Sequence, residues 1–180
     1  MQKIRILEKW YLYFMLYSII GWLYEVFLEV VVYQWGFSNR GVLFGPYCPI
    51  YGTGALIFII CLRKLKKRPI RIWKISITPI LVFIGIVCIT TLLELLGSYI
   101  MEITFGSWMW DYTTYAMNFQ GRVALNPSLR FGLGGMIFMY LLQPLFEKLT
   151  NRLTNKILNI ITIAVITCFV LDIIYTFIIK

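Results

Sequence analysis

The sequence contains no histidine and only eight acidic residues. Without histidine the commonest general base is missing, and without a cysteine–histidine cluster most zinc sites are excluded. There is no glycine-rich Walker motif, so we do not expect the chain itself to hydrolyse ATP. The four cysteines, Cys48, Cys61, Cys88 and Cys168, have no paired spacing, and three of them lie inside apolar runs. We interpret the cysteines as packing residues, with only Cys48 open to another role. We therefore assign no catalytic residue, metal site or cofactor.

Long polar stretches are also missing. The chain is 60% hydrophobic and 14% charged, with a mean hydropathy of +0.79, which is too apolar for a soluble core. No polar stretch between apolar runs is much longer than about twenty residues, whereas an independent domain usually needs at least ~50. We expect an all-α, polytopic membrane bundle that forms a single transmembrane domain over residues 1–180.

Five apolar runs are long enough to be transmembrane helices, since about 20 residues cross the hydrocarbon core. The first is too long for a signal peptide and keeps Glu25 and Glu29, so we expect it to be retained. The second is the shortest, and the sequence leaves open whether residues 36–52 form a re-entrant turn that leads into it. The expected helices are 10–33, 47–63, 76–103, 127–147 and 157–179.

The net charge of +9 could indicate nucleic-acid binding, but 13 of the 17 basic residues lie at three places beside apolar runs. These are residues 3–9, 63–74 and 148–156, which alternate as five crossings require. Lys and Arg are retained on the cytoplasmic side, so we predict the N-terminus inside, the C-terminus outside and no nucleic-acid partner. Four basic residues remain for the outer side: Arg40, Arg122, Arg130 and Lys180.

Three intramembrane acids fall at a similar depth in this topology. Glu25, Glu94 and Asp172 each lie about eight residues inside an expected outer helix end, or roughly 10–12 Å below the interface. Burial of such a group costs about 2.5–3.5 kcal/mol, so the acids either join helices, pair with a charge or face a functional cavity. We expect the three carboxyls to form one site, with Glu102 on the same helix stripe as Glu94.

The two predicted outer loops contain residues 39–52 and 108–122. Both are dense in Gly, Pro, Trp, Tyr, Asn and Arg, which predicts fixed, folded paths. Arg40 and Arg122 are the basic residues of these loops. They could lock the acids in ion pairs or clamp an anionic ligand. The candidate ligand-binding residues are Glu25, Asn39, Arg40, Glu94, Glu102, Trp110, Asp111, Tyr112, Asn118, Arg122 and Asp172.

The chain resembles the bacterial family described as putative ABC-transporter type IV, or CmpB-like, over nearly its whole length. The matching pieces are Gly21-Trp22 with Glu25, Asn39-Arg40-Gly41, the run from Gly45 to Gly52, Glu94 and Glu102, Trp110-Asp111-Tyr112, Asn118 with Gly121-Arg122, and Asp172. The resemblance implies a permease of the bacterial plasma membrane.

Three functions are compatible with these residues. The first is transport or binding of a small polar solute at the outer carboxylates, with a partner subunit or a second copy because five helices are few for alternating access. The second is an outer-leaflet enzyme that acts on a lipid or lipid-linked substrate with Glu or Asp as general base. The third is a membrane assembly protein. Membrane lipid is a partner in all three.

Overall fold

The computed structural model describes residues 2–179 and divides into two compact units. Unit one contains the chain up to Leu56 and again from Leu145, and unit two contains Ile57–Pro144. Lys180, which the charge pattern assigns to the outer side, lies outside the described residues.

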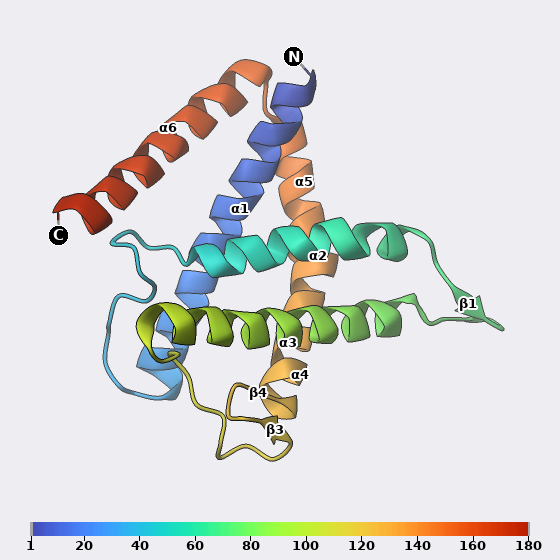
Figure 1. The fold of residues 1–180 in the computed structure, drawn as a ribbon. Coiled ribbons are helices and arrows are strands. Elements are labelled where there is room, and N and C mark those ends of the chain that lie inside the picture. The colour runs from blue at the N-terminus through green and yellow to red at the C-terminus, as the bar shows by residue number, and fades with distance from the viewer. Residues whose placement is uncertain (1, 180) are drawn as a thin grey trace. The chain divides into compact units, whose positions relative to one another are not determined.

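Unit one is built on two long helices (Figure 1). Helix α1 runs over Gln2–Phe27 and continues as a π-helical turn, Leu28–Val32; helix α6 runs over Asn155–Ile174 and continues as a π-helical segment, Tyr175–Ile179. Thr154 caps the start of α6, where its hydroxyl accepts a hydrogen bond from the backbone N–H of Ile157 at 3.3 Å. The ring of Phe14 packs edge-on against Phe169 at 6.0 Å and joins the two helices.

The two basic flanks of unit one meet at one end of α1. Arg5 donates to the backbone carbonyl of Leu153 at 2.8 Å, and the ammonium of Lys9 donates to Asn151 Oδ1 at 2.5 Å. The first turns of α1 and the corner between helices α5 (Gln143–Arg152) and α6 therefore lie together at one end of unit one, as the alternating topology requires. Which side of the membrane this is stays a prediction.

The loop after α1 returns to the middle of that helix. The backbone N–H of Cys48 donates to the carbonyl of Ser18 at 2.9 Å, and Gly52 packs against Ser18 so closely that an added Cβ would overlap its hydroxyl. Ser18 lies 14 residues before Val32, which is about 21 Å along a helix. Non-helical backbone is tolerated at such depth only where protein or a cavity covers it, and Tyr47 and Cys48 are indeed buried.

Helix α2, Pro49–Lys67, begins at this re-entrant point. Because the loop has already descended beside α1, a helix shorter than a full span can complete the second crossing. We infer that this is why α2 does not need the length of the other helices. The five-crossing topology itself stays a prediction.

Unit two contains the end of α2, helix α3 (Thr78–Phe105) and helix α4 (Leu125–Ile137). A short hairpin precedes α3, with strands β1 (Arg71–Ile72) and β2 (Ile75–Ser76); another precedes α4, with strands β3 (Asn118–Phe119) and β4 (Val123–Ala124). Both hairpins are antiparallel. Helix α3 ends at Gly106, whose φ of +76° permits the left-handed cap that terminates the helix.

Helices α3 and α4 pack closely through glycine. A Cβ added to Gly132 would lie 2.6 Å from Val87 Cγ2, and one added to Gly135 would lie 2.5 Å from Ile86 Cγ2. Small residues allow such close approach between membrane helices. Helix α4 continues through the π-helical turn Phe138–Leu142 into α5.

The predicted all-α class and the count of about five helices are confirmed. Four helices among residues 2–179 are long and apolar enough to cross a membrane: Gln2–Val32, Thr78–Phe105, Leu125–Arg152 and Asn155–Ile178. Helix α2, expected over 47–63, is a fifth helix but is not among these four, so its crossing of the membrane stays a prediction. Helices α3 and α6 bury few of their residues inside the protein, as lipid contact requires.

Candidate functional site

Glu25 in unit one binds a tyrosine from the start of α2. The Tyr51 hydroxyl donates to Glu25 Oε1, and the Tyr51 ring lies directly against Gly21, one helical turn before the glutamate. A Cβ at Gly21 would overlap that ring. The glycine therefore provides the space that lets Tyr51 reach the carboxyl.

Glu29, in the π-helical turn, holds Arg40 in a two-point ion pair. Arg40 Nε donates to Oε2 at 3.0 Å, and a second guanidinium nitrogen lies 2.9 Å from Oε1. The Ser38 hydroxyl also donates to Oε1, at 2.6 Å. Glu29 is 7% exposed and Arg40 is 34% exposed, so this pair fixes the loop to the end of α1.

The side chain of Asn39 joins the same loop to helix α1 and to itself. Its side-chain carbonyl accepts from the indole N–H of Trp22 at 2.8 Å. Its amide donates to the backbone carbonyls of Leu43 and Phe44, at 3.2 and 2.8 Å. Both polar atoms of its side chain are therefore hydrogen-bonded within unit one.

Asp172 on α6 accepts four hydrogen bonds. The donors are the backbone N–H of Phe44 at 3.1 Å, the backbone N–H of Gly45 at 2.9 Å, the Tyr47 hydroxyl, and the Thr176 hydroxyl at 3.2 Å. A carboxylate that accepts several charge-assisted bonds is strongly stabilised. Asp172 therefore anchors the re-entrant loop to the last helix.

Arg122 in unit two is the most enclosed charge of the candidate set. Its guanidinium donates to Glu102 Oε2 at 2.5 Å and to Ser98 Oγ at 3.3 Å. Two rings cover its faces, Trp108 at 4.0 Å and Tyr99 at 4.2 Å from ring centroid to guanidinium carbon. Arg122 is 6% exposed, and its Nε and the indole nitrogen of Trp108 are buried without a hydrogen-bond partner among residues 2–179.

Glu94 differs from the other candidate acids because its unpaired carboxylate oxygen is buried. The Tyr112 hydroxyl donates to Oε1 at 2.9 Å, whereas Oε2 is buried and has no hydrogen-bond partner within the described chain. A buried polar atom left unpaired costs about 1–3 kcal/mol. The fold therefore maintains one carboxylate oxygen in a state that a ligand, a proton or a water would stabilise.

The remaining candidates of the second outer loop hold its shape. Asp111 accepts from the backbone N–H and the hydroxyl of Thr113, at 2.9 and 3.0 Å, and Asn118 accepts from the backbone N–H of Gly121 at 3.1 Å. The indole N–H of Trp110 donates to the backbone carbonyl of Arg122 at 2.7 Å. These bonds fix the loop segment that presents Tyr112 and Arg122.

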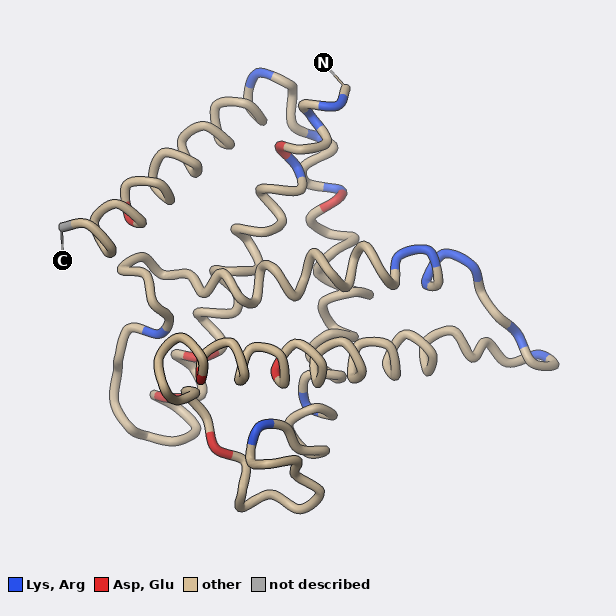
Figure 2. Tube along the Cα trace, viewed as in Figure 1, with Lys and Arg blue, Asp and Glu red and all other residues tan. Residues whose placement is uncertain are grey.

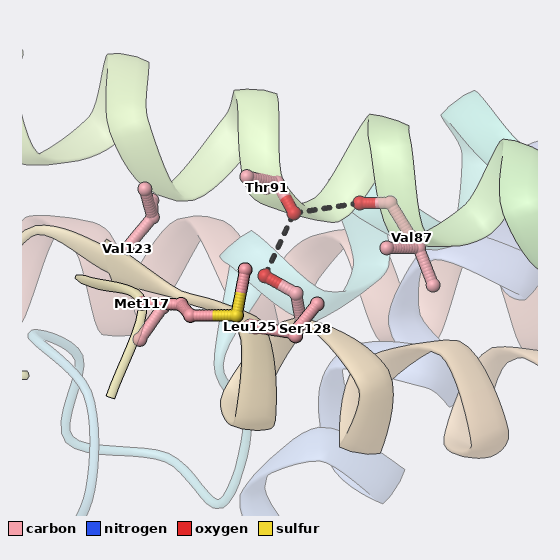
Figure 3. A pocket seen from close by; sticks show the side chains of 7 residues that line it. Val87, Thr91, Met117, Val123, Leu125 and Ser128 are labelled. Atoms are coloured by element: carbon pink, nitrogen blue, oxygen red, sulfur yellow. Dashed lines mark hydrogen bonds between the residues drawn. The ribbon is translucent and has the colours of Figure 1, made fainter. Parts of the chain in front are cut away.

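A cavity of about 250 Å³ lies between α3 and the start of α4 (Figure 3). Two of its wall residues, Thr91 and Ser128, are joined by a 2.7 Å hydrogen bond. The rest of the lining is apolar, from Val87, Met117, Val123, Ala124 and Leu125. Thr91 is three residues before Glu94, so the two side chains share one face of α3.

The two units follow a common scheme. In each, the acid nearer the end of its helix binds the loop arginine, and the acid one or two turns deeper binds a tyrosine hydroxyl. The predicted convergence of Glu25, Glu94 and Asp172 joins residues of both units and stays a prediction.

Sequence reasoning did not select several residues that complete these contacts. Tyr51 and Tyr47 lie in the Gly-Pro-rich run but were not assigned to the site, and Ser38 is next to Asn39. Trp108 and Tyr99 could have been selected as aromatic residues near Arg122, because an arginine often packs against aromatic rings. Within residues 2–179 no group of three or more Cys, Asp or Glu residues is arranged to hold a metal ion.

A family model described as putative ABC-transporter type IV matches residues 12–177. No curated protein and no solved structure matches the chain. Together with the four apolar helices, the family match defines a multi-pass protein of the bacterial plasma membrane with a membrane transport role. The chain belongs to the putative ABC-transporter type IV, CmpB-like, family, as the sequence motifs predict.

Proposed function

We propose that this chain is a permease component that binds a small polar solute at Glu94 of unit two, on the predicted outer side of the membrane. The carboxylate would take the cationic group of the solute or a proton moved with it. A chain without an ATP-binding motif needs a partner subunit or an ion gradient as its energy source. A second copy or a partner subunit would also complete the translocation path.

The observation that supports this proposal is the unpaired Oε2 of Glu94. Glu29, Glu102 and Asp172 each contact a loop arginine or several loop donors, which is the arrangement of structural anchors. An ionisable residue within a membrane helix usually marks a solute or ion pathway. Glu94 is a better solute-binding group than these three acids, because its buried oxygen is free to bind a ligand.

The cavity beside α3 also supports Glu94 as the solute-binding residue. Val87 and Thr91, which line its α3 side, lie on the α3 face that carries Glu94, and Ser128 of α4 completes the hydroxyl pair. Ligand sites commonly combine an apolar lining with a few placed polar groups. A solute with one cationic and one small apolar part fits this combination.

An uptake screen tests the proposal. Purified protein in liposomes is exposed to a defined mixture of amines, amino acids and quaternary ammonium compounds, with a pH gradient in either direction, and the vesicle contents are analysed by mass spectrometry. We expect selective accumulation of a cationic or zwitterionic solute by the wild type, and none by Glu94→Gln. Accumulation equal to that of protein-free vesicles for every compound, with any candidate energising subunit present as well, would contradict the proposal.

A further inference from the structure

The basic segment that joins α2 to α3 is an ordered hairpin. Strands β1 and β2 pair with Arg71 opposite Ser76 and Ile72 opposite Ile75. The base is closed by two further bonds, from the N–H of Ile77 to the carbonyl of Ile70 at 3.0 Å and from the N–H of Ile70 to the Thr78 hydroxyl at 2.7 Å. These hydrogen bonds therefore fix the shape of the segment.

Large apolar side chains on this hairpin are exposed. Trp73, at the tip, is 96% exposed, and Ile75 and Ile72 are 72% and 57% exposed. Because Ile72 and Ile75 are directly opposite each other, they lie on the same face of the hairpin. An apolar face with tryptophan at its tip is typical of an element that lies at a membrane interface.

The backbone of Trp73 provides an independent observation. Its φ is +56°, the left-handed region, which is unfavourable for a bulky residue. Two-residue hairpin turns normally place Gly, Asn or Asp at such a position. Strain kept at an exposed aromatic residue indicates that the side chain has a use outside the chain.

The charges around this tip are of one sign. Seven basic residues lie between Arg63 and Lys74, and the sequence has no acidic residue between Glu29 and Glu94 (Figure 2). Lys66 is turned inward, where its ammonium donates to the carbonyl of Met139 and lies 4.9 Å from the centroid of the Tyr140 ring. The other six are exposed: Arg63, Lys64, Lys67, Arg68, Arg71 and Lys74.

The hairpin is also held close to the membrane. Trp73 is five residues before Thr78, the first residue of a candidate membrane span, and five extended residues reach at most about 17 Å. The tip must therefore remain near the headgroup layer. We propose that this hairpin is a binding site for anionic phospholipid headgroups, with the ring of Trp73 inserted at the acyl boundary and the exposed Lys and Arg side chains around it on the phosphates.

The test uses the full-length protein in vesicles and the emission of Trp73 alone, obtained as wild type minus Trp73→Phe. The vesicles contain phosphatidylcholine, or an equal mixture of phosphatidylcholine and phosphatidylglycerol, with brominated acyl chains as the membrane quencher and acrylamide as the aqueous quencher. We expect brominated lipid to quench this emission, more strongly with phosphatidylglycerol, and acrylamide to have little effect.

A matched pair of arginine variants tests the charge. Phosphatidylglycerol retained by the protein in mixed nanodiscs is measured by mass spectrometry. Arg71→Gln should lower the preference for phosphatidylglycerol about fivefold, since each basic residue near a charged surface contributes about that factor. Arg130→Gln, an exposed arginine in α4, should leave the preference unchanged. Emission quenched by acrylamide and not by brominated lipid in both mixtures would overturn the proposal and favour a protein partner. Equal effects of the two arginine variants would also overturn it.

Discussion

Removal of the charge of Glu102 should destabilise unit two because it leaves Arg122 buried without its carboxylate. A buried ion pair loses about 3–5 kcal/mol when one partner is removed, and an exposed pair about 0–1 kcal/mol. The Arg122 side chain is 7% exposed, but that of Glu102 is 42% exposed, so water screens one end of the pair. We expect Glu102→Gln to cost about 2 kcal/mol, or about 4–8 °C in a chain of this length.

The double variant provides the sharper comparison. Glu102→Gln with Arg122→Met removes the uncompensated cation, and methionine keeps an apolar side chain between Trp108 and Tyr99. It should be no less stable than Glu102→Gln alone. Thermal unfolding of the purified variants in detergent measures this, and Glu8→Gln is the control because it changes only an exposed hydrogen bond from Asn159. A double variant whose loss equals the sum of the two single losses would refute the reasoning.

Three further predictions concern other parts of the chain. Gly21→Ala should cost about 1–3 kcal/mol in thermal stability because the new methyl overlaps a tyrosine ring, whereas Gly134→Ala, which meets nothing within 4 Å, should not destabilise. Asp172→Asn should loosen the re-entrant loop by about 1–3 kcal/mol, seen as faster amide exchange at residues 43–48, because the amide offers only one accepting oxygen to two backbone donors. In intact cells lacking the native cysteines, an impermeant reagent should label cysteine at Thr113 and not at Arg68; the opposite pattern would overturn the predicted topology.

Apolar run length was enough to predict the helices. Helix α3 was expected over 76–103 and runs over Thr78–Phe105, since a span must cover the same thickness whatever it packs against. Polar residues on apolar helices, such as Glu94 and Asp172, also marked the candidate site, because each must be compensated.

The partners of those residues could not be predicted from the sequence. The contact between Cys48 and Ser18 depends on a loop path that no local pattern encodes, and Asp172 binds backbone N–H groups, which every residue but proline carries. The choice of Glu102 for Arg122 and Tyr112 for Glu94 depends on how the loop of residues 106–122 folds over α3.

The most direct test of the proposed function is solute uptake by Glu94→Gln compared with wild type, on protein of known thermal stability. Gln keeps the volume and can still accept the hydrogen bond of Tyr112, but it cannot carry a charge or a proton. The proposal predicts that uptake stops at every pH tested while the unfolding temperature stays near that of wild type. Uptake by Glu94→Gln at the wild-type rate would contradict it.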